Sequence, residues 1–348
     1  MKLNSKSLLL VSLIITSFFA RFITAYTLGD KAIDNEWDIL VNNLINYKSF
    51  SFYVAGDEII PSAYMPPMYP LLLYFIKIVT FEKVDFINSI IFFQIIISTY
   101  SVYVFYELNQ KIFSNKLSLI NSFIFSFFPL NLYATGQISS ISLQIFLSLL
   151  FLKFSFSLCE KKSIKNIIIF SIASGILILT RGEFVLIFLA TLFYLIFYKK
   201  ISLSTLMKTI LIVFLVISPY MVRNYIHFNE VFIVKSFGFN LWKGNNQMSL
   251  VGGTSSIYPP NTYQELKNWK ISENSEYTIL KKKLENIKID KYYEINRDKV
   301  FLDEATNNLY KDPYRYMNLF LKKIFSYYFI DFKSNYPNYY NLFHFLPV

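Results

Sequence analysis

Seven long apolar runs, separated by short polar stretches, dominate the front part of this chain. A membrane-spanning helix requires roughly 20 predominantly apolar residues. The runs that approach this length lie at about 8–27, 86–106, 117–135, 140–158, 166–181, 184–198 and 208–222. The pattern predicts an all-α polytopic membrane protein. Because the first run is long and Phe18-Phe19-Ala20-Arg21-Phe22 offers no convincing cleavage site, we expect it to remain as an anchor.

Composition agrees with this class. Of 348 residues, 54% are hydrophobic and 16% are charged, whereas soluble domains carry about 25% charged residues. The net charge of +11 comes largely from lysines between the apolar runs, which the positive-inside rule places on the cytoplasmic side. They are Lys2 and Lys6, Lys111 and Lys116, Lys161, Lys162 and Lys165, and Lys199, Lys200 and Lys208. We therefore expect the lipid bilayer, not nucleic acid, as their partner.

Alternation around these lysines sets the expected topology. The segment 66–81 is short and opens with prolines, so we expect it to lie along or dip into the outer interface. The first external loop then runs from about 28 to 85. The domains expected are a membrane bundle over 1–222, an extracytoplasmic loop region over 223–316, and a return to the membrane over 317–348 that ends early, as if truncated.

The sequence offers no sign of a metal or cofactor site. Cys159 is the single cysteine, and the two histidines, His227 and His344, are far apart. The Gly252–Ser256 stretch lacks the spacing of a phosphate-binding loop. We predict neither a cofactor nor an essential metal, although carboxylates could still hold a metal ion.

Five polar clusters are expected on the outer side. They are Asp34-Asn35-Glu36-Trp37-Asp38, Tyr64-Met65-Pro66-Pro67, Gly136-Gln137-Ile138-Ser139-Ser140, Arg181-Gly182-Glu183 and Arg223-Asn224-Tyr225. Their convergence indicates a site, although loop ends are polar in every membrane protein. The acidic cluster opens an amphipathic segment with apolar residues at helical spacing. Its acids could instead serve only as a helix cap and a favourable first-turn charge.

Several of these motifs resemble the GT-C class of membrane glycosyltransferases, in particular the bacterial branch related to protein mannosyltransferases and aminoarabinose transferases. The similarity consists of the acids Asp34 and Glu36, the proline turn at 66–70, Leu179-Thr180-Arg181-Gly182-Glu183, Arg223-Asn224 after Pro219, and the run Gly238–Asn246. The resemblance implies a GT-C-like bundle with external juxtamembrane helices and a small extracytoplasmic loop domain. It also implies a sugar donor linked to polyprenyl phosphate.

In such a transfer, a carboxylate accepts the acceptor's proton as the anomeric carbon becomes oxocarbenium-like. We expect Asp34 to be this base, with Glu36 as the second choice. The guanidinium of arginine can donate two parallel hydrogen bonds to phosphate oxygens. The expected ligands of the donor phosphate are therefore Arg223 with Asn224, and Arg181. Both arginines could instead snorkel, and Arg181 could pair with Glu183. By resemblance, Gln137 and Asn245 are expected to bind substrate.

Together these observations predict an inverting transferase of the plasma (inner) membrane. It would move a sugar from a polyprenyl-phosphate donor to an extracytoplasmic acceptor, with its active site facing the extracytoplasmic side. The alternative is a non-enzymatic flippase or carrier, or a polymerase of the O-antigen type. A transporter should carry polar or broken helices near mid-bilayer, whereas here the notable charges are expected at helix ends, which favours the transferase.

Overall fold

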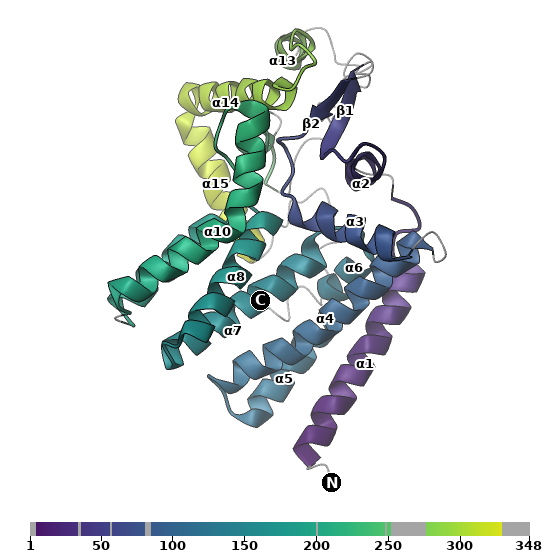
Figure 1. Ribbon diagram of the computed structural model, residues 1–348, viewed down its shortest axis with the longest axis vertical. Helices are drawn as coiled ribbons and strands as arrows, with labels where there is room; N and C mark the ends of the chain where they lie inside the picture. Colours follow the sequence, from purple (N-terminus) through teal and green to yellow (C-terminus); the bar gives the residue numbers. More distant parts are fainter. Residues whose placement is uncertain are drawn as a thin grey trace. The chain divides into compact units, whose positions relative to one another are not determined.

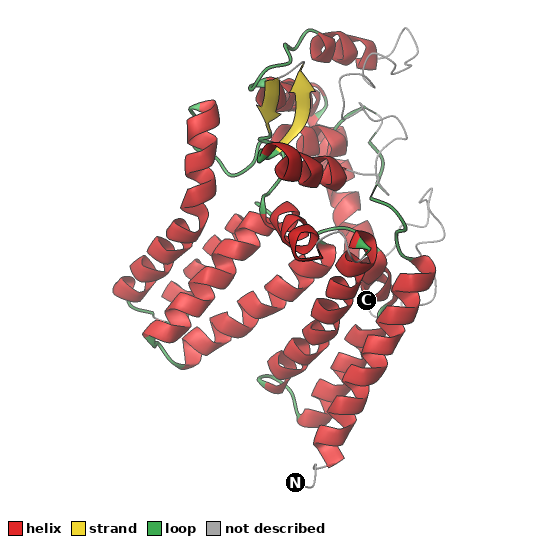
Figure 2. Ribbon diagram, turned by 45° about the vertical axis from the view of Figure 1, so that its right-hand side comes forward, coloured by secondary structure: helices red, strands yellow, loops and turns green. Residues whose placement is uncertain are grey.

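The computed structural model describes residues 5–33, 36–55, 58–80, 85–199, 201–247, 249–251 and 276–328. Helices account for almost all of its regular structure, together with one small antiparallel sheet (Figure 2). The chain divides into unit 1, residues 1–48 and 66–225, and unit 2, residues 49–65 and 226–348. Within the described part, four helices are long and apolar enough to span a membrane, or five if one bent pair is counted as a span. The predicted class, an all-α polytopic membrane protein, is confirmed.

Unit 1 consists of helices that cover all seven predicted runs. They are α1 (Ser5–Leu28), α2 (Glu36–Tyr47), α3 (Met68–Thr80), α4 (Phe86–Gln110), α5 (Asn115–Phe127), α6 (Pro129–Gly136), α7 (Ile141–Glu160), α8 (Ile164–Thr180), α9 (Phe184–Phe197) and α10 (Leu203–Phe228), whose last turn enters unit 2. The candidate spans are α1, α4, α7 and α10. The helices α8 and α9 have 17 and 14 residues, so each is shorter than a usual span.

The run at 117–135 is not one continuous helix. The chain breaks at Phe128, and α5 and α6 meet at a bend of 49°. Pro129 explains the break, because proline disfavours helical geometry at the preceding residue and donates no backbone hydrogen bond. Phe128 accordingly has extended backbone angles, φ −63° and ψ 120°. The predicted run is therefore helical but interrupted, and the bent pair is a fifth candidate span when its two helices are counted together.

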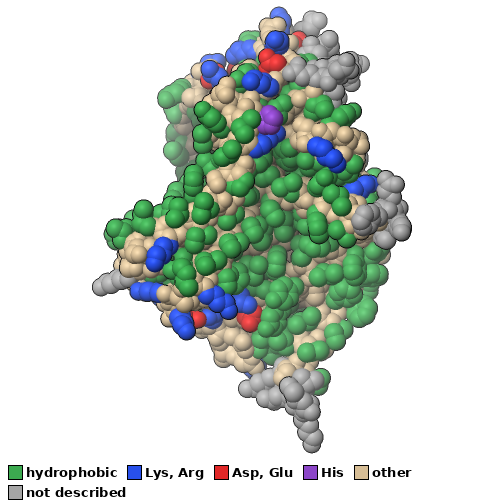
Figure 3. All heavy atoms as spheres, in the orientation of Figure 1, with side chains coloured by type: hydrophobic (Ala, Val, Ile, Leu, Met, Phe, Trp, Pro, Cys, Tyr) green, Lys and Arg blue, Asp and Glu red, His purple; other side chains and the backbone are tan. Residues whose placement is uncertain are grey.

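The lysines next to the termini of the long helices lie at one end of unit 1, which we call the lysine end. Lys111 at the end of α4 contacts Glu160 at the end of α7, with Nζ 2.6 Å from Oε1. Lys199, after α9, lies close enough to Cys159 to act on it electrostatically. Figure 3 shows Lys and Arg side chains gathered along the lower edge of unit 1, beneath a band of hydrophobic side chains. The expected alternation of the helices therefore fits the fold, and the side of the membrane stays a prediction.

The opposite end of unit 1 carries Arg181 and Arg223; we call it the arginine end. Here α1 and α6 approach through two glycines. A Cβ added to Gly136 would lie 2.9 Å from the Cα atoms of both Ala25 and Gly29. Only glycine fits such a crossing, as at close helix contacts in membranes. Figure 1 shows α3 lying across this end of α4 instead of running parallel to it.

The end of α10 lies beyond the predicted apolar run, which was expected to finish at about residue 222. Pro219 lies inside α10, and the helix continues to Phe228. Proline removes one backbone hydrogen bond but a helix can pass through it. Arg223 and Asn224 are therefore part of the helix instead of following it.

The described part of unit 2 contains a hairpin and four helices after the end of α10. Their bounds are β1 (Ser51–Ala55), β2 (Glu58–Pro61), α11 (Phe237–Gly244), α13 (Glu276–Glu285), α14 (Tyr293–Lys311) and α15 (Pro313–Tyr328). The core is aromatic, with the rings of Phe239, Trp242 and Phe301 in contact at centroid distances of 5.1 to 6.5 Å. Tyr277, Leu280 and Leu284 of α13 complete it. Of the expected return to the membrane over 317–348, only residues up to Tyr328 are described, and α15 is not among the candidate spans.

A buried carboxylate joins the hairpin to α14. Glu294 accepts hydrogen bonds from Ser62 Oγ at 3.0 Å and from the Ala63 backbone N–H at 2.5 Å. Burial raises the pKa of Glu294 to about 7, although the hydrogen bonds from residues 62–64 and the charge of Arg297 act in the opposite direction. Glu294 thus fixes the stretch directly before the proline turn to the first turn of α14.

Candidate active site

The first expected base, Asp34, lies outside the described residues. The second, Glu36, is the first residue of α2 and is half-buried. The amphipathic prediction for this segment is confirmed, because α2 buries Leu40 and Val41. Trp37 stacks edge-on against Tyr69 of α3, with ring centroids 5.0 Å apart. The acidic turn of α2 is thereby held against α3.

Gln137 is tied to α4 through its backbone. Gln94 Nε2 donates to the carbonyls of Thr135 at 3.0 Å and Gln137 at 2.9 Å. The Oε1 atom of Gln94 accepts from the Tyr69 hydroxyl at 3.1 Å. One buried amide therefore joins the loop before α7 to α3, and the side chain of Gln137 is half-buried.

Asp30 is a carboxylate at this end that the sequence analysis did not select. Its Oδ2 accepts from the Ile138 backbone N–H at 2.7 Å, and its own N–H donates to Gly136 O at 2.9 Å. This reciprocal pair fastens the end of α1 to the Gln137 loop. The sequence signal for this role of Asp30 was weak, because it consists only of an acid directly after the first apolar run.

Arg181 follows α8 and has two partners. Its Nε donates to Gln144 Oε1 of α7 at 3.0 Å and lies 3.6 Å from Glu183 Oε1. The pairing with Glu183 that the sequence suggested is therefore present. Both side chains are largely exposed, with 41% and 62% of their surface accessible, so this ion pair contributes little to stability. The guanidinium remains accessible to an anion.

Arg223 reaches the same end of unit 1 from α10. Its Nη1 donates to Asn224 Oδ1 at 2.8 Å, and its guanidinium carbon lies 5.7 Å from the Tyr220 ring centroid. The helices α8 and α10 both start at the lysine end, and they cross closely where a Cβ on Gly175 would meet Val216 Cγ1 at 2.6 Å. Arg181 follows Gly175, and Arg223 follows Val216, by nearly the same number of residues. Both arginines therefore lie beyond the crossing of α8 and α10, on the side away from the lysine end.

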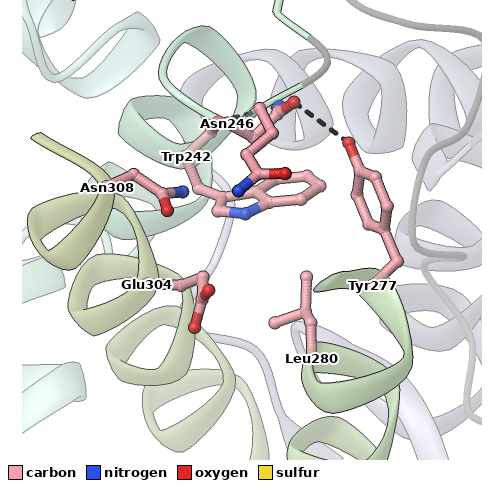
Figure 4. Close-up of a pocket in the computed structure, with 7 residues that line it drawn as sticks. Trp242, Asn246, Tyr277, Leu280, Glu304 and Asn308 are labelled. Atoms are coloured by element: carbon pink, nitrogen blue, oxygen red, sulfur yellow. Dashed lines mark hydrogen bonds between the residues drawn. The ribbon is translucent and has the colours of Figure 1, made fainter. Parts of the chain in front are cut away.

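Asn245 belongs to unit 2 and ends α11. Its Nδ2 donates to Leu241 O at 2.8 Å, and its backbone carbonyl accepts from Asn308 Nδ2 at 3.4 Å. The next residue, Asn246, borders a polar cavity of about 10 Å³ (Figure 4), which is enough for one water molecule. The cavity is lined by Trp242, Asn246, Gln247, Tyr277, Leu280, Glu304 and Asn308. In this state Asn245 acts as a cap and the neighbouring cavity is too small for a sugar.

No group of three or more His, Cys, Asp or Glu side chains in the described part of the chain is arranged to hold a metal ion.

The comparison with protein families gives one match. Residues 65–222 match the dolichyl-phosphate-mannose-protein mannosyltransferase family. The resemblance to GT-C membrane glycosyltransferases is confirmed. The match supports a membrane glycosyltransferase of the GT-C type, and such enzymes use polyprenyl-phosphate sugars in a membrane setting. No curated protein matches the chain.

The matched segment covers less than half of the chain and runs from the proline turn to Val222, near the end of α10. It contains Gln137 and Arg181, whereas Asp34, Glu36, Arg223, Asn224 and Asn245 lie outside it. The roles of all these residues therefore remain proposals.

One argument from the sequence requires correction. Notable charges were expected only at helix ends, yet Arg21 is fully buried within α1 and a broken helix pair lies beside it. Counting apolar runs conceals a single charge, because the average over 20 residues stays apolar. The charge pattern alone therefore does not separate a transferase from a transporter.

Proposed function

We propose that this protein is an inverting glycosyltransferase that moves a sugar from a polyprenyl-phosphate donor to an acceptor on the extracytoplasmic side of the plasma membrane. The observation that carries the proposal is the family match over 65–222. It is supported by the arginine end of unit 1, where Gln137 and Arg181, both within the matched segment, are found. The acceptor would be a glycolipid, a polysaccharide or a protein.

The reaction requires one base and a stabilised leaving group. A carboxylate, Asp34 or Glu36, accepts the proton of the attacking hydroxyl or amine. The acceptor atom bonds to the anomeric carbon while the bond from that carbon to the phosphate oxygen breaks on the opposite face. Polyprenyl phosphate leaves with the bonding electrons and already carries charge, so no acid is needed to protonate it.

The two arginines suit the phosphate. A guanidinium remains charged near lipid and can place two N–H donors on phosphate oxygens. Arg223 is oriented by Asn224, and Arg181 by Gln144. We assign Gln137 and, in unit 2, Asn245 to substrate contacts, with the cap that Asn245 forms opening when substrate binds.

The test measures whether the full chain transfers radiolabelled sugar from polyprenyl-phosphate sugars into cell-envelope fractions. Asp34→Asn and Glu36→Gln are compared with Asp38→Asn, a matched control because Asp38 is an acid in the same first turn of α2. Expression in the membrane is equalised first. Loss of transfer in one of the first two variants, with Asp38→Asn active, identifies the base. Equal transfer in all three would exclude both acids.

A flippase is the second candidate, and buried Arg21 beside the α5–α6 break is the observation that favours it, because transporters place such features within the membrane. Purified protein in vesicles separates the two. A transferase makes a new glycosidic product, whereas a flippase exposes labelled donor lipid on both leaflets without converting it.

A further inference from the structure

Among the described residues of unit 1, Arg21 is the only charged residue that is fully buried. It lies within the candidate span α1 and its side chain has no exposed surface. Among the described residues no carboxylate forms a salt bridge with it. A charge in this position is costly in a membrane and marks a functional element. Two features matter here: the groups that stabilise the Arg21 charge and the segments that its hydrogen bonds hold in place.

Backbone carbonyls and hydroxyls take the place of a counter-ion. The Nη1 atom of Arg21 donates to Ser126 O at 3.0 Å and to Ser17 Oγ at 2.5 Å. Ser126 lies in the last turn of α5, where the break at Phe128 leaves carbonyls without helical donors. The carbonyl end of a helix carries partial negative charge. Asn131 Nδ2 adds a second donor, to Phe125 O at 3.3 Å.

A chain of hydrogen bonds connects Arg21 to the arginine end. Arg21 Nε donates to Ser98 Oγ at 2.8 Å. The same Ser98 Oγ accepts from Thr135 Oγ1 at 3.0 Å. Gln94 Nε2 then bonds the carbonyls of Thr135 and Gln137. The chain runs along α4 and links the middle of α1 to the loop before α7.

We propose that Arg21 is a positioning residue. Its guanidinium holds the open end of α5 and, through Ser98 and Thr135, fixes the backbone of the Gln137 loop. Its consequence for sugar transfer rests on the proposed function, whereas its effect on the loop does not. Arginine suits this role better than lysine, because its planar fork bonds Ser98 and the end of α5 at the same time.

The direct test measures the exposure of position 137. A Cys159→Ser, Gln137→Cys background is labelled with a polar maleimide in detergent, and the rate is read by mass spectrometry. Arg21→Met and Ser98→Ala should each increase the rate about tenfold or more, because the loop opens locally. Arg21→Lys should give a smaller increase. Thr16→Ala is the control, since the Thr16 hydroxyl bonds only carbonyls of its own helix.

A second cysteine distinguishes positioning from general loosening. Ser118→Cys replaces Gln137→Cys in a parallel background, because Ser118 is fully buried near the lysine end of α5. Its labelling should stay slow in every variant. Unchanged labelling at 137 overturns the proposal, and so does an equal rise at both positions. If Arg21→Met does not fold, Ser98→Ala decides alone.

The activity arm uses proteins with the native Gln137. A fall in kcat/KM in Arg21→Met and Ser98→Ala, with Thr16→Ala unaffected, is expected. If labelling at 137 increases while wild type transfers no sugar, the positioning role stands and the proposed function fails. Full transfer in variants whose loop has opened would overturn the link between Arg21 and the reaction.

Discussion

Raising the pH should loosen unit 2 at Glu294, where burial and hydrogen bonding act in opposite directions. The carboxyl is buried and accepts from Ser62 Oγ and the Ala63 N–H. These donors favour the charged form, yet burial dominates and raises the pKa to about 7. In the folded protein the neutral form therefore predominates below about pH 7.

The size of the effect follows from linkage. The pKa rises from 4.5 in the unfolded chain to about 7 in the folded one, and each pKa unit corresponds to about 1.4 kcal/mol. The folded state therefore gains roughly 3 kcal/mol when Glu294 is protonated. Because the folded pKa is the higher one, this stabilisation is complete below 4.5 and is lost as the pH rises through about 7.

Hydrogen exchange of the amides at 62–64 measures this locally. After correction for intrinsic exchange, wild type should be protected more strongly at about pH 5.5 than at about pH 8. Glu294→Gln should lose this pH dependence because it is neutral throughout. Glu304→Gln is the control, since Glu304 lies on the same helix and pairs with Lys283 at the surface.

Two results would refute the reasoning. An equal pH dependence in Glu294→Gln would assign the effect to another group. Stronger protection at high pH would mean that the donors of residues 62–64 outweigh burial and lower the pKa.

Two further predictions concern packing. Gly136→Ala should sharply reduce the yield of folded protein in size-exclusion chromatography, because the added Cβ would meet backbone atoms at 2.9 Å. Gly244→Ala is the control and should leave the yield unchanged, because the nearest atom to its added Cβ is Lys323 Nζ at 3.6 Å. A normal elution profile for Gly136→Ala would contradict the crossing of α1 and α6. Phe301→Ala should destabilise unit 2 by about 3–5 kcal/mol in chemical denaturation, because Phe301 is fully buried. Tyr310→Ala, at a position 83% exposed, should have little effect, and equal losses would be inconsistent with the described core.

The helices were predictable because long apolar runs leave few alternatives. Helices occupy all seven predicted intervals, although the one at 117–135 is interrupted at Phe128. The break at Phe128 was missed although its signal, Pro129, was present, because counting apolar residues ignores backbone chemistry. The β1–β2 hairpin was missed for a similar reason: Phe52-Tyr53-Val54 and Ile59-Ile60 are strand formers on either side of Gly56-Asp57, a typical hairpin pattern.

The site was predictable only as a location. Topology places loop ends on one side, and Gln137, Arg181 and Arg223 do lie at the same end of unit 1. Their partners depend on contacts between residues far apart in sequence, such as Gln94 with Gln137 or Asp30 with Ile138. Sequence periodicity carries no information on such pairs. Arg21 and Glu294 escaped notice because a single charge does not change a helical pattern.

These two buried ionisable side chains are stabilised in the same way. Arg21 bonds carbonyls at the end of α5, and Glu294 bonds N–H groups at the end of the hairpin. In both cases the backbone had broken its regular pattern and left polar groups that must be satisfied when buried. Replacing either side chain by an apolar residue would therefore remove an ionisable group and also leave those backbone groups without hydrogen-bond partners. The loss would fall on the adjoining segments, the Gln137 loop in unit 1 and residues 62–64 in unit 2, which is why local exposure is the sensitive measurement for both.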